Sequence, residues 1–187
     1  MSALTKLYRR ADRPVPEPLS DWENQVAGWC EQYTAKYEQA EISEINLDFA
    51  VFLFDHSTER VTLAYAVSGK QLMKRDANRM RGFPRVDVSI RANLKEKAFF
   101  ADKGHFLGHA SGGILDINLF PQRRELNRGW SAEGKRFRNM ERYVAEHPGI
   151  FFYHRPLYDD ETWIPESLEY GVLVEDSEWW VDTFRNK

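Results

Sequence analysis

Short apolar segments bounded by turn-forming residues constrain the fold of this chain more than any other feature of its sequence. They have the length and the Val, Ile, Phe, Tyr and Trp content of β-strands, and they span residues 49–54, 60–67, 86–90, 150–158, 168–174 and 179–184. The turn-like residues 55–59 join the first two segments, which predicts a hairpin. None of the runs is long enough to cross a bilayer, so we expect no membrane association. The pattern predicts an α+β fold with a mostly antiparallel central sheet and flanking helices.

Two further segments have the spacing or the composition of helices. Residues 20–40 carry apolar side chains at helical spacing, and Ser20 followed by Glu23 forms a capping box at their start. We expect this stripe to face the core, with a partner-binding surface as the alternative; it comprises Trp22, Val26, Trp29, Cys30, Tyr33 and Tyr37. Residues 121–146 have helical composition, interrupted near 127–130. Residues 1–18 contain three prolines and predict an extended arm.

The composition predicts a single domain over residues 1–187, in which residues 1–48 form the arm and a helix packed on the rest. Hydrophobic residues make up 42% and aromatic residues 14% of the chain, which is typical of a globular protein. The one cysteine, Cys30, excludes an intramolecular disulfide and a cysteine-rich zinc site. Residues 1–10 are not followed by the apolar segment of a secretory signal. We therefore expect a cytoplasmic location, with delivery into another cell as an alternative.

The charge of the chain is unevenly distributed. The net charge is −3, yet residues 70–142 contain 17 Lys and Arg against 8 Asp and Glu. A polyanion such as a nucleic acid could bind this region and be repelled by the remainder. The alternative is that these charges lie on solvated helix and loop faces.

A first cluster of chemically useful residues follows residue 101. It reads Asp102-Lys103-Gly104-His105 and continues through Gly108-His109 to Gly112-Gly113. A histidine can act as a base near neutral pH, and glycine lets the backbone approach a ligand or adopt positive φ. Taken alone, each histidine could equally be structural, and we favour that role for His109.

A second cluster lies between residues 118 and 133. It reads Asn118-Leu119-Phe120-Pro121-Gln122, then Asn127-Arg128-Gly129-Trp130, then Glu133. An asparagine side-chain oxygen is a hard neutral ligand that suits Mg²⁺. Taken alone, either asparagine could instead be a helix cap.

Together the two clusters resemble the DNA/RNA non-specific endonuclease family, whose catalytic core is the ββα-metal (His-Me) finger. The segment is most similar to the compact branch common in bacterial toxin domains, and Asn118 and Asn127 have the nine-residue spacing typical of the family. The resemblance covers residues 100–142 closely, extends loosely to about 174 and does not include the first 48 residues. It implies a ββα-metal finger at about residues 98–146.

The resemblance also implies a role for each residue of the motif. His105 would be the general base, and Asn127 the main protein ligand to Mg²⁺, with Mn²⁺ as an alternative ion. Asn118 would fix the loop or the histidine, and Glu133 would orient metal-bound water. Lys103 stands where the family has arginine, which replaces a bidentate phosphate contact with a point charge. Lys103 and Arg136 would neutralise charge on the phosphate, and the expected nucleic-acid contacts are Arg123, Arg124 and Arg128.

The function implied is a Mg²⁺-dependent endonuclease that hydrolyses phosphodiester bonds of DNA and/or RNA with little sequence specificity. Resemblance to toxin domains suggests a toxin or defence effector, which would need an inhibitor or immunity protein, and a homo-oligomer is open. One alternative is a catalytically weakened nucleic-acid-binding module of the same fold. The other is a protein that binds a partner through its N-terminal aromatic helix.

Overall fold

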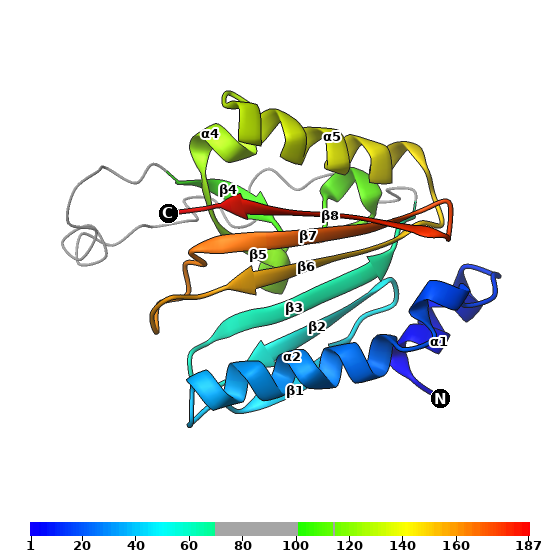
Figure 1. Ribbon diagram of the computed structural model, residues 1–187, viewed down its shortest axis with the longest axis horizontal. Coiled ribbons are helices and arrows are strands. Elements are labelled where there is room, and N and C mark those ends of the chain that lie inside the picture. Colours follow the sequence, from blue (N-terminus) through cyan, green and yellow to red (C-terminus); the bar gives the residue numbers. More distant parts are fainter. Residues whose placement is uncertain (70–100, 114) are drawn as a thin grey trace.

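The computed structural model describes residues 1–69, 101–113 and 115–187. Within these residues, six strands form one antiparallel sheet in the order β1-β2-β3-β6-β7-β8 (Figure 1). Its strands are β1 (Ile42–Asn46), β2 (Ala50–Asp55), β3 (Arg60–Val67), β6 (Phe151–Leu157), β7 (Ser167–Val174) and β8 (Glu178–Arg185). A separate pair, β4 (Ala101–His105) and β5 (Leu119–Arg123), is also antiparallel. The expected α+β fold with a mostly antiparallel sheet is confirmed.

The predicted strands inside the described ranges are all present. Residues 60–67 match β3, and 49–54 match β2 to within one residue, with the hairpin turn between them. β1 was not predicted, because its polar edge-strand sequence has no continuous apolar run and its residues are only partly buried. The predicted strand at 86–90 lies outside the described residues.

Both faces of the central strands are buried, which explains why they read as continuous apolar runs. Successive side chains of a strand point to opposite faces. Ala50 and Phe52 of β2 belong to one hydrophobic cluster, and Val51 and Leu53 belong to another. The first cluster includes α5 (Ala132–Glu146), and the second includes α1 (Ala3–Arg10) and the start of α2 (Trp22–Lys36). In Figure 1, α2 runs along the β1–β2 end of the sheet and α5 along the β7–β8 end.

The expectation of an extended arm over residues 1–18 is wrong for residues 3–10, which form α1. Ser2 caps a helix over Ala3–Arg10 by accepting a hydrogen bond from Thr5 N at 3.2 Å. Its buried face consists of Ala3, Leu4, Leu7 and Tyr8. The prolines begin only at Pro14, so they do not interfere with this helix.

The aromatic stripe of α2 faces the core, as expected. Trp22 is 1% exposed and packs edge-on against Tyr65 and Phe151 of the sheet. The predicted capping box is wrong, because the helix begins after Asp21 and the structure shows no side-chain cap there. Within the described residues, no helix is long and apolar enough to cross a membrane.

The helical segment expected at 121–146 is divided into three elements. Its first residues belong to β5, followed by α4 (Arg124–Asn127) and then α5. Ser131 caps α5 by accepting from Gly134 N at 2.9 Å. Pro121 is tolerated in β5 because it lies opposite Lys103, at a position of the antiparallel pair where the backbone nitrogen points away from the partner strand.

One histidine is built into the core of the sheet. His154 of β6 is 1% exposed and stacks on Tyr170 at a centroid distance of 3.8 Å. Burial lowers the pKa of His154 to about 3, because the charged imidazolium would lose its hydration. The fold therefore holds this imidazole neutral.

We expect the fold to lose stability in acid because of His154. In the unfolded chain an ordinary histidine titrates near pH 6.5. Below that pH the unfolded state therefore binds a proton that the folded state does not bind. Between pH 7 and pH 5 this effect lowers the free energy of unfolding by about 2 kcal/mol. Urea unfolding at both pH values should show this loss in the parent and a smaller loss in His154→Phe. Equal pH dependence in the two proteins would contradict the assignment.

Candidate active site

A β-hairpin followed by a short helix carries the residues that the sequence singled out. β4 and β5 pair from Ala101 opposite Arg123 to His105 opposite Leu119, and α4 follows β5 directly. α4 packs against both strands of this hairpin and against α5. This unit runs strand, strand, helix along the chain, and its assignment as a ββα finger stays a prediction. The first residues of the predicted finger, 98–100, lie outside the described residues.

Asn118 fixes the loop that follows His105. Its side-chain oxygen accepts from Leu107 N, and its side-chain nitrogen donates to Leu107 O, both at 2.8 Å. The backbone of Phe106 also donates to Asn118 O at 3.0 Å. Asn118 is fully buried, so these bonds are shielded from water. Asn118 therefore holds the backbone of Leu107 from both sides of its amide.

Asn127 contacts the edge of β4 that does not pair with β5. Since Phe106 N donates to Asn118 O, alternation along the antiparallel pair turns the carbonyls of Lys103 and His105 away from β5. Asn127 Nδ2 donates to the carbonyl of Lys103 at 3.2 Å. This bond uses the amide nitrogen and does not consume the side-chain oxygen, which is the atom able to bind a cation.

His105 and Asn127 consequently lie near one another. Lys103, which Asn127 contacts, is two residues from His105, or about 7 Å along the strand. Lys103 and His105 project from the same face of β4, because side chains alternate along a strand. Nε2 of His105 is shielded from solvent. The imidazole and the lysine thus share one face of β4, and the carboxamide of Asn127 contacts its edge at Lys103.

The glycines of the first motif are required by packing. A Cβ on Gly104 would lie 2.5 Å from Cβ of Gln122, and one on Gly113 would lie 1.9 Å from Leu107 O. Gly112 has a φ of +100°, a conformation that favours glycine. Gly104 and Gly113 therefore serve the close approach of chain segments to one another, and Gly112 serves the backbone conformation of the turn.

Asp102 holds two of the expected nucleic-acid contacts. Arg124 Nε donates to it at 3.1 Å, and Arg128 donates through both Nε and Nη2. Burial alone would raise the pKa of Asp102, but the hydrogen bonds from Arg128 and Arg124 outweigh it, and the net pKa is lowered. Arg128 remains about half exposed, so a phosphate can still reach it.

Two more of the expected site residues, Glu133 and Arg136, pair with residues in or next to β8 and β5. Glu133 forms an ion pair with Arg123 and accepts from Arg185 N at 2.6 Å. Arg123 is opposite Ala101, four residues from His105, or about 13 Å along β4. Arg136 pairs with Asp182 of β8 at 2.9 Å. Arg123, Glu133 and Arg136 thus each have a protein partner in this region.

The other flank of α5 faces the finger and carries residues that the sequence reasoning missed. Gly134 packs against α4, since a Cβ there would lie 2.4 Å from Glu125 O. Residues four and seven positions later share this flank, and they are Arg138 and Glu141. Glu141 lies beside Gly108 in the loop that follows His105, and Arg138 pairs with it at 2.8 Å. The sequence signal that could have indicated this flank is Gly134, because its lack of a side chain allows the close packing on α4.

Glu141 has an unusual electrostatic setting for a carboxylate on a helix surface. Burial raises the pKa of Glu141, and the ion pair with Arg138 only partly opposes this effect. A desolvated carboxylate next to a single arginine keeps an attraction for a further cation. One of its oxygens would lie 3.9 Å from a Cβ placed on Gly108, in the loop that follows His105.

Oxygen donors of the kind that Mg²⁺ prefers are present on α4 and α5. Within residues 1–69, 101–113 and 115–187, no group of three or more His, Cys, Asp and Glu side chains could hold a metal ion. Mg²⁺ prefers oxygen ligands and usually keeps several waters, so it needs few protein ligands. The side-chain oxygen of Asn127 and the carboxylate of Glu141 are oxygen donors of that kind.

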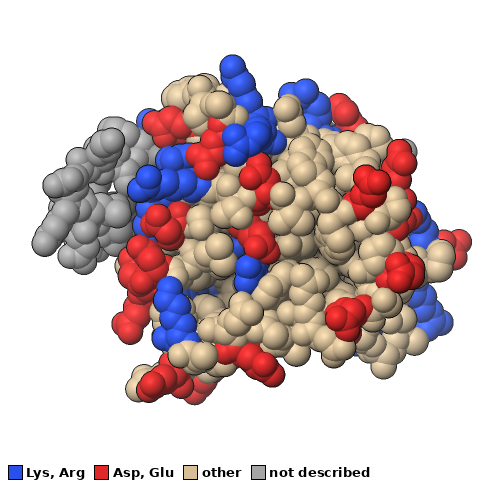
Figure 2. Space-filling model, viewed as in Figure 1, with Lys and Arg blue, Asp and Glu red and all other residues tan. Residues whose placement is uncertain are grey.

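The surface near α4 is basic but not uniformly so. Figure 2 shows Lys and Arg side chains gathered at the α4 end of the molecule, interleaved with Asp and Glu. The exposed parts of Arg124, Arg128 and Arg138 lie in this region. The charge asymmetry seen in the sequence is therefore partly local pairing, as the ion pairs of Asp102 and Glu141 show.

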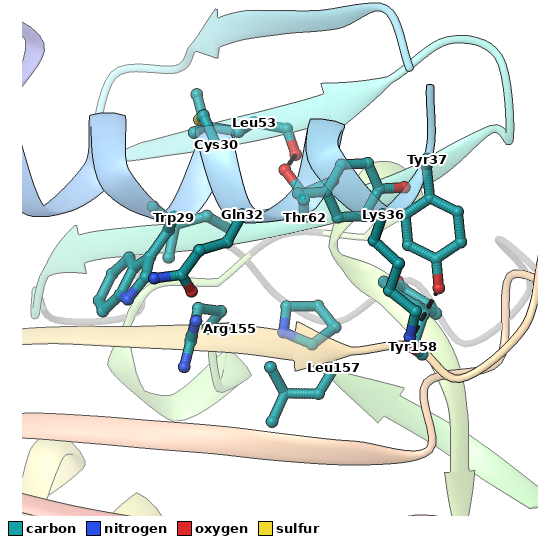
Figure 3. Close-up of a pocket in the computed structure, with 13 residues that line it drawn as sticks. Trp29, Cys30, Gln32, Lys36, Tyr37, Leu53, Thr62, Arg155, Leu157 and Tyr158 are labelled. Atoms are coloured by element: carbon teal, nitrogen blue, oxygen red, sulfur yellow. Dashed lines mark hydrogen bonds between the residues drawn. The ribbon is translucent and has the colours of Figure 1, made fainter. Parts of the chain in front are cut away.

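A cavity of about 240 Å³ lies on the other face of the sheet, between α2 and strands β3 and β6 (Figure 3). Two cations line it, and both have protein partners. Arg155 lies over the Trp29 ring and pairs with Glu169, and Lys36 donates to Tyr158 O. The cavity is therefore separate from the hairpin site, which packs in the opposite hydrophobic cluster.

Comparison with known proteins adds little to this description. No family model matches the sequence, and no curated protein matches it. Among solved structures, the fold is similar to that of an extracellular endonuclease, with a TM-score of 0.43, 15% identity and 79% of each chain covered. A similarity at that level does not transfer an activity, so the function is argued from the site itself.

Replacing Asn118 should loosen the loop after His105. Asn118→Ala removes both side-chain bonds and leaves the buried N–H and C=O of Leu107 without them, at a cost of about 2–4 kcal/mol. Urea unfolding of the variant measures this cost. Asn46→Ala is the matched control, because Asn46 is exposed on β1 and its loss should change stability by less than about 0.5 kcal/mol. A variant as stable as the parent would show that the bonds do not hold the loop.

Proposed function

We propose that this chain is a Mg²⁺-dependent endonuclease that hydrolyses phosphodiester bonds of DNA and/or RNA. The observation that carries the proposal is the hydrogen bond from Asn127 to the carbonyl of Lys103. It joins the helix that bears a cation ligand to the strand that bears His105. A base and a hard oxygen ligand on one hairpin–helix unit form a suitable centre for phosphodiester hydrolysis.

In the proposed reaction, neutral His105 accepts a proton from a water molecule as that water attacks phosphorus. A new P–O bond forms, the bond to the leaving oxygen breaks, and the leaving oxygen takes up a proton from solvent. Asn127 would hold Mg²⁺ through its side-chain oxygen, with Mn²⁺ as an alternative. When bound, the ion supplies positive charge for the phosphoryl and leaving oxygens.

The remaining residues would position these groups. Asn118 holds the loop after His105, and Lys103 shares the face of β4 with the histidine, where its charge can reach the phosphate. Glu141 would orient ion-bound waters, a role expected of Glu133 from the sequence, because it lies beside the His105 loop whereas Glu133 pairs with Arg123. Arg138 would hold the Glu141 carboxylate in place through their ion pair.

The substrate contacts proposed for Arg124 and Arg128 are contacts to phosphate, which carry no sequence information. Low sequence specificity follows from them. An enzyme of this kind would act as a toxin or defence effector and would need restraint by an inhibitor or immunity protein.

The role of the general base is tested by His105→Ala. The variant should fold normally and lose about 10²–10⁴-fold in turnover or more, because the attacking water is no longer deprotonated. Cleavage of plasmid DNA and of RNA with Mg²⁺ measures the loss, and EDTA should abolish cleavage by the parent. His56→Ala is the control, since His56 is exposed in the β2–β3 turn. A His105→Ala protein as active as the parent would remove the histidine from the mechanism.

Two glutamates on α5 give a matched comparison. Glu141→Gln should reduce cleavage about 10–100-fold, most strongly at limiting Mg²⁺, if this carboxylate orients ion-bound water. Glu133→Gln removes the same charge at the other flank of the helix and should mainly lower thermal stability by weakening its contacts with Arg123 and Arg185. Cleavage rates across a Mg²⁺ titration, together with melting curves, separate the two. A larger loss of cleavage in Glu133→Gln than in Glu141→Gln would instead assign the water-orienting role to Glu133.

A further inference from the structure

One aromatic side chain beside the candidate site projects into solvent. Within the described residues, the exposed aromatic side chains are Trp130, with 62% of its surface accessible, and Trp179, with 37%. Trp179 packs against Trp22, Phe151 and Tyr153 and so belongs to the edge of the core. Trp130 is the more exposed of the two and lies in the turn between α4 and α5.

The backbone of this turn is firmly held. Trp130 N donates to Glu125 O at 3.0 Å, and Gly129 N donates to Leu126 O at 3.2 Å. Gly129 adopts a φ of +70°, and a Cβ on Gly134 would lie 3.0 Å from Gly129 Cα, so α5 packs directly on the turn. The indole is therefore presented from a fixed backbone.

A guanidinium lies against the ring. Arg128 Cζ is 4.9 Å from the centroid of the Trp130 ring, within the range of a cation–π contact. Asp102 fixes the same guanidinium through Nε and Nη2. Asp102, Arg128 and Trp130 thus form a stack in which the ring stays accessible.

The stack is close to the proposed cation ligand. Trp130 is three residues after Asn127, so their Cα atoms are at most about 11 Å apart. A nucleotide whose phosphate lies at Asn127 would have its own base, or that of a neighbour, within reach of the indole. Aromatic side chains bind nucleobases by stacking, and Arg beside the ring strengthens the contact.

We propose that Trp130 is a stacking platform for a nucleobase next to the scissile phosphate, with Arg128 holding the ring in place. This proposal rests on the proposed nuclease function and specifies its substrate. In a duplex both faces of each base are covered by neighbouring pairs, whereas an unpaired base can stack on a protein ring. The preferred substrate is therefore single-stranded or locally opened nucleic acid.

The test measures binding and cleavage separately. Binding of a short fluorescent single-stranded oligodeoxynucleotide is measured with Mg²⁺ in the His105→Ala background, with and without Trp130→Ala. Loss of one stacked base should raise Kd by about 5- to 150-fold, and Trp130→Phe should recover part of the affinity. Val181→Ala is the control, because it removes exposed apolar surface on β8.

A base-deletion series identifies the contact itself. Single abasic nucleotides are placed in turn along the oligonucleotide. One position should weaken binding to the Trp130-containing protein by the same factor and have no effect on Trp130→Ala. In the protein with His105, Trp130→Ala should lower cleavage of single strands more than cleavage of duplex of the same sequence.

The outcomes separate this proposal from the nuclease function. If the protein with His105 cleaves nucleic acid but Trp130→Ala binds and cleaves single strands as the parent does, the stacking role is wrong and the nuclease function stands. If the protein with His105 neither binds nor cleaves DNA or RNA, both proposals fail. Equal losses on single strands and duplex, with no abasic position that distinguishes the proteins, would also overturn the stacking role.

Discussion

The hydrogen bond from Asn127 to the carbonyl of Lys103 joins the two halves of the candidate site. Among the described strands β4 pairs only with β5, and the amide of Asn127 contacts its other edge at Lys103. Through this contact α4 and β4 keep a fixed relation, and His105 lies two residues further along the same strand. The chemistry proposed here depends on that relation, since neither group alone can hydrolyse a phosphodiester.

The two faces of the sheet are covered by different elements. On one face, α1 and α2 bury an aromatic cluster around Trp22, and the cations beside it, such as Arg155, are paired. On the other, α5 packs on the sheet with one flank and on α4 and the turn at His109–Ser111 with the next. The orientation of α5 about its axis decides which carboxylate meets the His105 loop. Gly134 sets that orientation by close contact with α4.

Much of this could be predicted from the sequence, and the failures have physical causes. β2 and β3 were predicted because burial on both faces demands continuous apolar residues, whereas the edge strand β1 needs none. The helix at Ala3–Arg10 was missed because the prolines after it dominated the pattern and the Ser2 cap is a single residue. Asn118 and Asn127 were candidates because the resemblance to a nuclease family, which includes their spacing, implied roles for them. Glu141 does not, because its place depends on a tertiary contact of Gly134.

The central claim is that the imidazole of His105 and the carboxamide of Asn127 meet at one divalent cation. Mn²⁺ titrated into the protein can test this by NMR, because a bound paramagnetic ion broadens the signals of nearby nuclei. The account predicts that the ring signals of His105 broaden at lower Mn²⁺ than those of His56 and His147, and that Asn127→Ala removes the difference. Uniform broadening of the three histidines, or selective broadening that survives in Asn127→Ala, would contradict it.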